Sequence, residues 1–248
     1  MKVIDTHTHF PGTSFGAHPR TGDEIREEFE SAGLAGAWIM TTDGLRGAPA
    51  RHNDLLAEGV KDHLDFFVPF CTVWPNEQAD TALDELERCA GELGMRGLKL
   101  HPWLQAFSLT HPAVLPILRK AGDLDLPVLF HDGTPPYCTP LQIAATAEKV
   151  PETTIILGHS GINDLYQDAI LACHRHQNIY LCLCSQKAGC IQEIIRRCPA
   201  DRLLFGTDAG FAENLIKPAI VGYLDLDVAE ETLKKIFYEN AQNLLPCN

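Results

Sequence analysis

Short apolar runs recur at intervals along the whole chain, and each has the length of a β-strand. They are rich in Val, Ile, Leu and Phe, with few polar residues before their ends. Near-continuous apolar runs of this kind are typical of strands that are buried on both faces of a parallel sheet. We therefore predict eight buried strands, at residues 2–9, 35–42, 66–73, 97–101, 127–131, 154–159, 179–184 and 203–208.

Helical periodicity fills the stretches between these runs. Residues 22–33 and 79–94 repeat apolar positions three or four apart, and they end at Gly33 and Gly94, which are typical helix stops. Residues 229–245 show the same period and close the chain. The pattern predicts that helices separate the strands.

The two patterns alternate eight times over 248 residues, and no Pro- or Ser-rich linker divides them. This number of units and this length are typical of a (β/α)8 barrel, the TIM barrel. We expect an α/β fold with a distorted barrel of this kind, as a single domain over residues 1–248. A doubly wound open sheet is the alternative, but no GxGxxG motif follows the first strand, so a dinucleotide-binding fold has no support.

Composition narrows the classes of partner. The chain is 45% hydrophobic and 21% charged, with a formal net charge of −13. It has no basic stripe for a nucleic-acid surface, no apolar run near the ~18 residues of a membrane span, and no secretory signal. We expect a cytoplasmic protein that acts on a small molecule, without nucleic acid or membrane. Its nine scattered cysteines, without a CxxC pair, are then expected to be reduced. Whether it forms a homo-oligomer stays open.

Titratable side chains stand at the carboxyl ends of the predicted strands. Active sites of TIM barrels lie at this end, whereas random placement would scatter such residues between both ends and the helices. We therefore expect one site, built from His7, His9, Lys99, His101, His131, His159 and Asp208.

His7 and His9 are two residues apart on one strand, so their side chains point to the same side and can reach one metal ion. A second pair with this spacing, His174 and His176, follows a helical run and precedes the seventh strand. Residues two apart on a helix diverge, so we assign this second pair no metal. Asp5, on the face of His7 and His9, is expected lower in the barrel as a structural partner of both.

Asp208 supplies a carboxylate that can bind a divalent ion and accept a proton, although it could also cap a following helix. His131 and His159 each follow an apolar run as a single histidine. With His7 and His9 these residues complete a ring of imidazole and carboxylate groups, which suits Zn²⁺ with space for water.

The other polar residues near the strand ends have less specific roles. Lys99 could neutralise a substrate carboxylate, be carbamylated and bridge two metals, or form a structural ion pair. His101 either turns toward the site or shapes its loop. Cys182 and Cys184 are interpreted as small buried thiols within a strand. At the mouth of the pocket, without a nucleophilic role, we place Ser185, Tyr137 and Cys138.

Five motifs in this order resemble those of the amidohydrolase superfamily of metal-dependent TIM barrels. The likeness is strongest to its amidohydrolase-related branch, which contains hydrolases and decarboxylases. The motifs are "IDTHTH", "GLKLHP", "ILGHSG" and "LLFGTDAG" at the first, fourth, sixth and eighth strands, and "IFYENAQNLL" in the last helix. TatD-type nucleases are a related group, but they carry an acidic ligand at the fourth strand, where this chain has Lys99.

The resemblance implies one divalent ion, usually zinc, held by His7, His9, His131 and Asp208. His159 would then either support the metal ligands without binding the ion or polarise the substrate. If Lys99 is carbamylated, the resemblance implies a second ion, held by His131 and His159.

The function expected from these residues is metal-dependent hydrolysis of an ester, lactone or amide in a small carboxylate-bearing substrate, through metal-activated water. Asp208 would accept the proton of that water, His159 would stabilise the developing oxyanion, and Lys99 would hold an anionic part of the substrate. One alternative is a non-oxidative decarboxylase of the aminocarboxymuconate-semialdehyde type. Another, of a different class, is a barrel that binds a metal or ligand without turnover.

Overall fold

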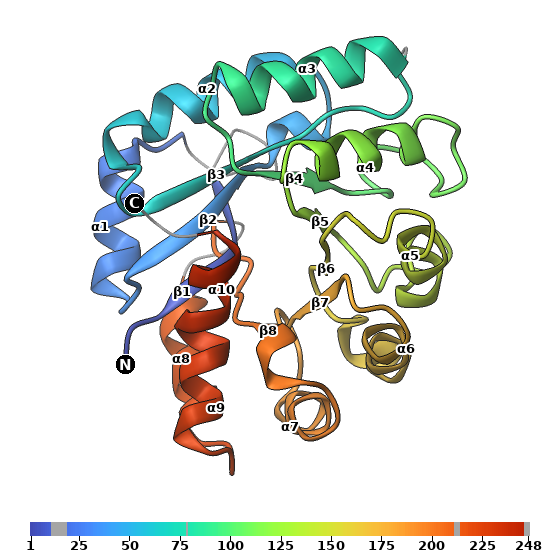
Figure 1. Cartoon of the computed structure of the whole chain (residues 1–248). Helices are drawn as coiled ribbons and strands as arrows, with labels where there is room; N and C mark the ends of the chain where they lie inside the picture. Colours follow the sequence, from blue (N-terminus) through green and yellow to red (C-terminus); the bar gives the residue numbers. More distant parts are fainter. Residues whose placement is uncertain (11–18, 78, 211–213, 246–248) are drawn as a thin grey trace.

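The computed structural model describes residues 1–10, 19–77, 79–210 and 214–245. Its eight strands form one parallel sheet in chain order, and they surround a common centre in Figure 1. This arrangement confirms the predicted TIM barrel. The strands are β1 (Ile4–Phe10), β2 (Gly36–Thr41), β3 (Phe67–Cys71), β4 (Gly97–Leu100), β5 (Val128–Phe130), β6 (Ile155–Leu157), β7 (Ile179–Cys182) and β8 (Leu203–Leu204).

Helices lie around the outside of the barrel (Figure 1). Helices α1 to α8 follow the strands of the same number, and the chain then runs through α9, the π-helical turn η5 and α10, where one long helix was predicted. The helices are α1 (Gly22–Ser31), α2 (Pro49–Val60), α3 (Ala79–Gly91), α4 (Val114–Asp123), α5 (Pro140–Ala147), α6 (Ile162–Arg175), α7 (Ala188–Arg197), α8 (Ile216–Leu224), α9 (Glu230–Lys234), η5 (Lys235–Glu239) and α10 (Asn240–Leu244). The short 3₁₀ turns are η2 (Asp43–Leu45), η3 (Lys61–His63) and η4 (Ala200–Arg202).

Local sequence sets the start of two of these helices. Thr21 accepts a hydrogen bond from the backbone N–H of Glu24, whose side chain accepts one from the N–H of Thr21. Thr139 and Gln142 form the same capping box at α5. Each box satisfies two backbone donors that the first turn of a helix leaves without partners.

The strands are shorter than the apolar runs that predicted them. The runs end in polar residues that lie in the loops just beyond the strands, because the barrel hydrogen bonds stop earlier. Cys184, predicted within a strand, also lies beyond β7. The carboxyl ends of the strands therefore lead directly into His101, His131, His159 and Asp208.

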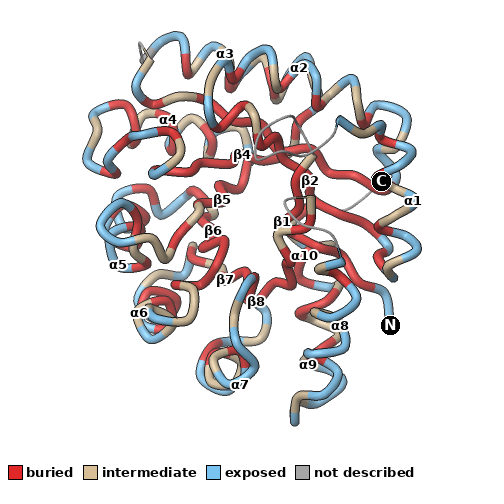
Figure 2. Tube along the Cα trace, turned by 180° about the vertical axis from the view of Figure 1, so that it is seen from behind, coloured by how far each residue is buried: buried red, intermediate tan, exposed pale blue. Residues whose placement is uncertain are grey.

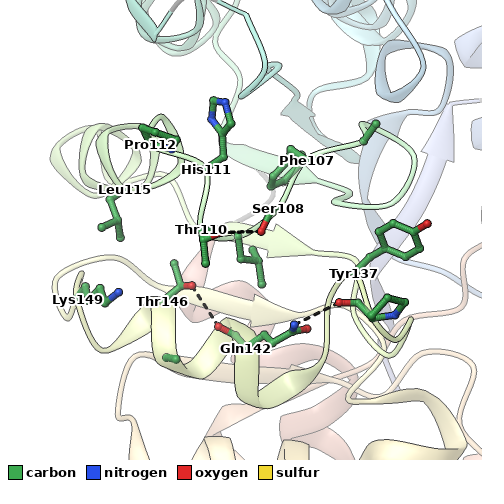
Figure 3. Close-up of a pocket in the computed structure, with 14 residues that line it drawn as sticks. Phe107, Ser108, Thr110, His111, Pro112, Leu115, Tyr137, Gln142, Thr146 and Lys149 are labelled. Atoms are coloured by element: carbon green, nitrogen blue, oxygen red, sulfur yellow. Dashed lines mark hydrogen bonds between the residues drawn. The ribbon is translucent and has the colours of Figure 1, made fainter.

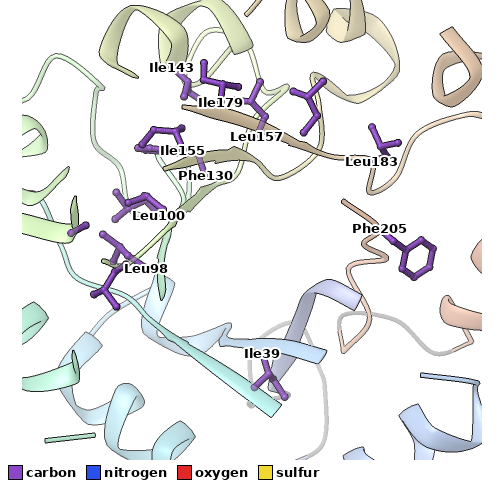
Figure 4. Close-up of a cluster of buried hydrophobic side chains, with 14 of the residues drawn as sticks. Ile39, Leu98, Leu100, Phe130, Ile143, Ile155, Leu157, Ile179, Leu183 and Phe205 are labelled. Carbon is purple, nitrogen blue, oxygen red and sulfur yellow. The ribbon is translucent and has the colours of Figure 1, made fainter. Parts of the chain in front are cut away.

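Alternation along the strands divides the buried side chains into two cores. The outer core, between strands and helices, contains Leu98 and Leu100 of β4 (Figure 4). The inner core, inside the barrel, contains Trp38 and Met40 of β2. Figure 2 shows the strands buried along most of their length. Because neighbouring residues of a strand face opposite sides, Lys99 points into the barrel.

An irregularity in β1 changes which side its residues face. Asp5 pairs with Ala37, but Thr8 pairs with Ile39, so β1 has one residue more than β2 over this stretch. His9 then pairs with Met40 of the inner core. This β-bulge turns the end of β1 so that its histidines face the barrel interior. It also breaks the alternation between Asp5 and the histidines, so the prediction that they share one face was wrong.

Backbone hydrogen bonds join the first strand to the segment around the last. The N–H of Thr6 donates to the carbonyl of Phe205 at 2.9 Å, and the N–H of Asp208 donates to the carbonyl of His7 at 2.8 Å. These contacts bring residues about 200 positions apart in the chain to the same place. Within the described ranges, no helix has the length and apolar character to cross a membrane.

Candidate metal centre

His7, His9 and Asp208 bring three donor atoms together at the carboxyl end of the barrel. Asp208 Oδ1 lies 2.9 Å from His9 Nε2 and 3.4 Å from His7 Nε2. Both imidazoles are buried, and the side chain of Asp208 is 27% exposed. The three residues offer donor atoms within 4.8 Å of one another, which is close enough to share one ion.

A hydrogen bond at Nδ1 leaves Nε2 of His7 available to bind a ligand. His7 Nδ1 lies 3.0 Å from the carbonyl oxygen of Gly158. A carbonyl only accepts, so Nδ1 carries the proton and Nε2 keeps its lone pair. Metal-binding histidines commonly donate their second nitrogen in this way, which fixes both the tautomer and the orientation of the ring. Burial lowers the pKa of His7 well below its usual value, which keeps the ring neutral.

Asp208 holds its position through an unusual backbone conformation. Its φ of 66° lies in the left-handed region, which non-glycine residues seldom adopt. The next helix, α8, begins at Ile216 with Leu215 as its N-cap, so the reading of Asp208 as a helix cap was wrong. Burial opposes ionisation of Asp208, but the neighbouring His7 and the hydrogen bond with His9 outweigh it and hold the pKa of the carboxyl well below its usual value.

Lys99 reaches the cluster formed by His7, His9 and Asp208 from β4. Its side chain is 1% exposed, and Nζ lies 2.9 Å from His7 Nε2. Burial lowers the pKa of Lys99 to about 8, although the Asp208 carboxylate acts in the opposite direction. The amine therefore stands beside the nitrogen that would bind a metal. It can meet an anionic group bound there.

His159 adjoins the cluster from the loop after β6. Its ring centroid lies 4.8 Å from that of His7, and its buried Nδ1 has no hydrogen-bond partner among the described residues. Burial lowers the pKa of His159 to about 4. Donor atoms of His7, His159 and Cys184 also lie within 4.8 Å of one another. Cys184 is a candidate that the sequence did not single out, although it is the last residue of the seventh apolar run.

His131 and His101 form a stacked pair at the edge of the cluster. Their ring centroids are 3.8 Å apart, with 10° between the planes. His131 also lies 4.6 Å from His159 by ring centroids, and its Nε2 lies 2.7 Å from the hydroxyl oxygen of Thr134. Among the described residues, His131 belongs to neither compact donor group. The predicted ligands His7, His9 and Asp208 thus lie together, with His131 one ring further away.

The donor set fits a divalent transition ion. It combines imidazole nitrogens with a carboxylate, and the His7 tautomer leaves a lone pair directed into the cluster. Imidazole and carboxylate ligands together suit zinc, iron or manganese.

Two further histidines lie elsewhere. His174 is an exposed residue of α6, and His176 is its C-cap, before the amino end of β7.

Asp5 lies below the cluster, where its carboxylate accepts hydrogen bonds from the N–H groups of His7 and Thr207 at 3.0 and 3.2 Å. It supports the backbone of His7 across β1 and the segment after β8.

A cavity of about 590 Å³ lies between the loop after β4 and helix α5 (Figure 3). Its lining includes Phe107, Tyr137 and Lys149, but no histidine of the cluster. Tyr137, expected at a pocket mouth, lines this cavity, whereas Cys138 is fully buried. Lys99 and His159, which adjoin the cluster, have pKa values lowered to about 8 and about 4, and such shifts are common at active sites, so we place the chemistry there and not in this cavity.

Similar proteins include two decarboxylases and a hydratase. The γ-resorcylate decarboxylase of Polaromonas sp. is 26% identical over 250 residues, covering 80% of this chain and 76% of that protein. The 2-keto-4-carboxy-3-hexenedioate hydratase of Sphingobium sp. is 23% identical, covering 99% and 96%. A crystal structure of a Polaromonas dihydroxybenzoic acid decarboxylase, with bound manganese and the inhibitor 2-nitroresorcinol, superposes with a TM-score of 0.76 at 21% identity, over 98% and 96% of the two chains.

The sequence also matches the model of one protein family along almost its whole length. The match covers residues 4–247 and therefore includes every residue of the cluster. It agrees with the resemblance inferred from the five motifs. The chain belongs to the amidohydrolase family.

Proposed function

We propose that this protein is a metal-dependent, non-oxidative decarboxylase of a small carboxylate-bearing substrate. The observation that carries the proposal is the grouping of His7, His9 and Asp208 beside the buried amine of Lys99. One relative, the decarboxylase, supports the same function, whereas the hydratase supports the second candidate considered below. The hydrolase expected from the sequence has weaker support, since neither of these relatives is a hydrolase.

We assign the ion to His7, His9 and Asp208, whose donor atoms lie together. His131, the further ligand that the resemblance implies, lies one ring away and would complete the set. This set suits zinc, iron and manganese alike, so the zinc expected from the resemblance becomes one of three candidates. A bound ion would supply a Lewis acid that polarises a substrate oxygen.

The chain's own residues would bind the substrate and move a proton. Lys99 Nζ would hold an anionic group of the substrate, because it is a buried cationic donor inside the barrel. Decarboxylation breaks the bond between carbon and carboxylate, releases CO2 and leaves an electron pair on the carbon, which then takes up a proton. His159 and Asp208 lie beside the His7 and Lys99 side chains, where the substrate would bind. We assign them the transfer of that proton.

An assay of three products tests the proposal. The protein, loaded with Mn²⁺ or Zn²⁺, is given hydroxybenzoates, unsaturated dicarboxylates, esters and lactones, and CO2 release, hydration and bond cleavage are measured. We expect metal-dependent CO2 release that Asp208→Asn abolishes without unfolding the protein. Ester or lactone cleavage without CO2 release would overturn the proposal in favour of a hydrolase.

A hydratase is the second candidate, because the hydratase relative aligns with 99% of this chain. It would use the same cluster to add water across a double bond. Loss of the double-bond absorbance without CO2 release would identify this activity.

A further inference from the structure

The loop that carries His159 has a backbone that sequence alone would not favour. Ser160, Gly161 and Ile162 have φ values of 47°, 83° and 48°, so three successive residues lie in the left-handed region. Glycine adopts this region freely, but a β-branched residue such as Ile162 is strained there. The surrounding structure must hold this loop, since the loop would otherwise relax.

One holding group is the carboxylate of Asp132, which follows His131 at the end of β5. Its Oδ1 accepts the backbone N–H of His159 at 2.6 Å, and its Oδ2 accepts the N–H of Gly161 at 2.5 Å. Asp132 is fully buried. Successive N–H groups in a left-handed turn form a concave site for an anion, and here a carboxylate of the same chain occupies it.

The other holding group is the amide of Gln186, in the segment after β7. Its Nε2 donates to the carbonyls of His159, Ser160 and Ile162 at 2.6, 3.0 and 3.0 Å. The loop is therefore bound on its N–H side from β5 and on its carbonyl side from β7. Both contacts include the backbone of His159 itself.

We propose that Asp132 and Gln186 form a clamp that positions the His159 imidazole for the reaction. Neither side chain is assigned contact with substrate or ion; both would act through His159. The His159 ring has little room to move, because its centroid lies 4.8 Å from that of His7 and 4.6 Å from that of His131. This inference rests on the proposed function for its kinetic effect, but the placement of His159 can be measured without turnover.

The chain supplies a matched control for Gln186. Asn178, before β7 at the opposite end of the barrel, also donates from its side-chain amide to three carbonyls, at 3.0–3.2 Å. Asn178→Ala therefore removes the same type and number of hydrogen bonds as Gln186→Ala, far from the cluster. A general loss of stability should appear in both variants, and a loss of positioning only in one.

The experiment compares Gln186→Ala, Asp132→Asn and Asn178→Ala with the parent protein. We measure the unfolding midpoint, amide hydrogen exchange at His159 and Gly161, and the ¹⁵N resonances of the His159 ring in the metal-free protein. We expect the midpoint to fall in both Gln186→Ala and Asn178→Ala. Only Gln186→Ala and Asp132→Asn should speed exchange in the loop and shift the His159 resonances. Unchanged exchange and ring signals in Gln186→Ala would refute the clamp, even if Asp132→Asn does not fold.

Kinetics of CO2 release complete the test. Gln186→Ala should lower kcat at least about tenfold with little change in KM, while Asn178→Ala should keep the parent kcat. In a His159→Asn background, Gln186→Ala should cost little more, because both changes remove the same contribution. Full additivity of the two losses would overturn the clamp. A parent protein that releases no CO2 would fail the proposed function, and the exchange and ring signals would still decide the clamp.

Discussion

His7 illustrates how neighbouring atoms prepare a single side chain. The carbonyl of Gly158 accepts a hydrogen bond from the N–H at Nδ1, while Nε2 faces Lys99 and Asp208. The backbone of Gly158 also lies too close to its neighbours to leave room for a side chain. A Cβ on Gly158 would meet the carbonyl oxygen of Phe130 at 2.5 Å and His7 Cε1 at 3.1 Å. The glycine is therefore required by close approach.

Gly158→Ala should destabilise the fold and displace the His7 ring. Because the nearest atom belongs to the backbone and cannot turn aside, we expect a loss of roughly 1–3 kcal/mol in the free energy of unfolding, together with weaker metal binding. Urea denaturation and metal titration measure the two effects. Gly189→Ala in α7, where nothing lies within 4 Å of the new Cβ, is the control and should be neutral or slightly stabilising. Equal stability of the two variants would contradict this account.

Lys99→Met tests the role of the buried amine. Methionine keeps most of the volume and removes the charge, so the unfolding midpoint should stay constant or rise, because a buried ammonium is costly. If Lys99 holds the substrate anion, kcat/KM for CO2 release should fall by about 100-fold or more, since a hydrogen bond to a charged group is lost from a dry site. Steady-state kinetics and calorimetry measure both. An unchanged kcat/KM would remove Lys99 from the mechanism.

At the scale of elements, contacts with neighbouring strands and helices determine how side chains of β1 and α3 are placed. The spacing of His7 and His9 predicts that they share a side, but the bulge in β1 decides that this side is the interior. In α3, Glu85 accepts hydrogen bonds from Arg88 and from Asn53 of α2. This contact joins two helices, and Asn53 in turn bonds the backbone of Thr72, after β3.

Glu85→Gln should lower the free energy of unfolding at neutral pH. In acid, the substitution should have little effect. Burial raises the pKa of Glu85, but Arg88 and Asn53 outweigh it, so the folded-state pKa lies below the ordinary value. The ionised form therefore stabilises the fold above about pH 4.3, and this stabilisation is lost as the pH falls through the folded-state pKa.

We expect a cost of about 1 kcal/mol at pH 7 that shrinks below pH 4, measured by chemical denaturation across pH. The control is Glu193→Gln, whose exposed carboxylate pairs with Arg196 on the same helix, and it should cause no measurable change. A cost at Glu85 that stays constant with pH would show that the charge is not responsible.

At the scale of the whole molecule, barrel closure assembles the candidate centre. His7 and Asp208 are 201 positions apart, yet a backbone hydrogen bond of 2.8 Å joins them. Any ion bound at this junction ties the first strand to the segment after the last. Binding should therefore stabilise the global fold, because the site exists only when the barrel is closed.

Divalent metal should raise the unfolding temperature through His7 and His9. At a metal concentration of 100 times Kd, the stabilisation is about 2.7 kcal/mol, or roughly 5–10 °C for a chain of this size. The double variant His7→Ala, His9→Ala should lose this shift. The double variant His174→Ala, His176→Ala should keep it, because that pair lies on and beside α6. Thermal unfolding with Mn²⁺ and with EDTA measures the effect, and loss of the shift in both double variants would disprove the assignment.

The sequence by itself determined the alternation of strands and helices, the barrel, and the end of the barrel at which the histidines, Lys99 and Asp208 gather. These features follow from local periodicity and from the position of polar residues after apolar runs. Only the tertiary structure decided the inward phase of β1, the approach of Lys99 to His7, the stacking of His131 on His101, and the contacts of Asp132 and Gln186 with the His159 loop. Register and such contacts depend on packing between distant segments, which no local pattern of residues contains.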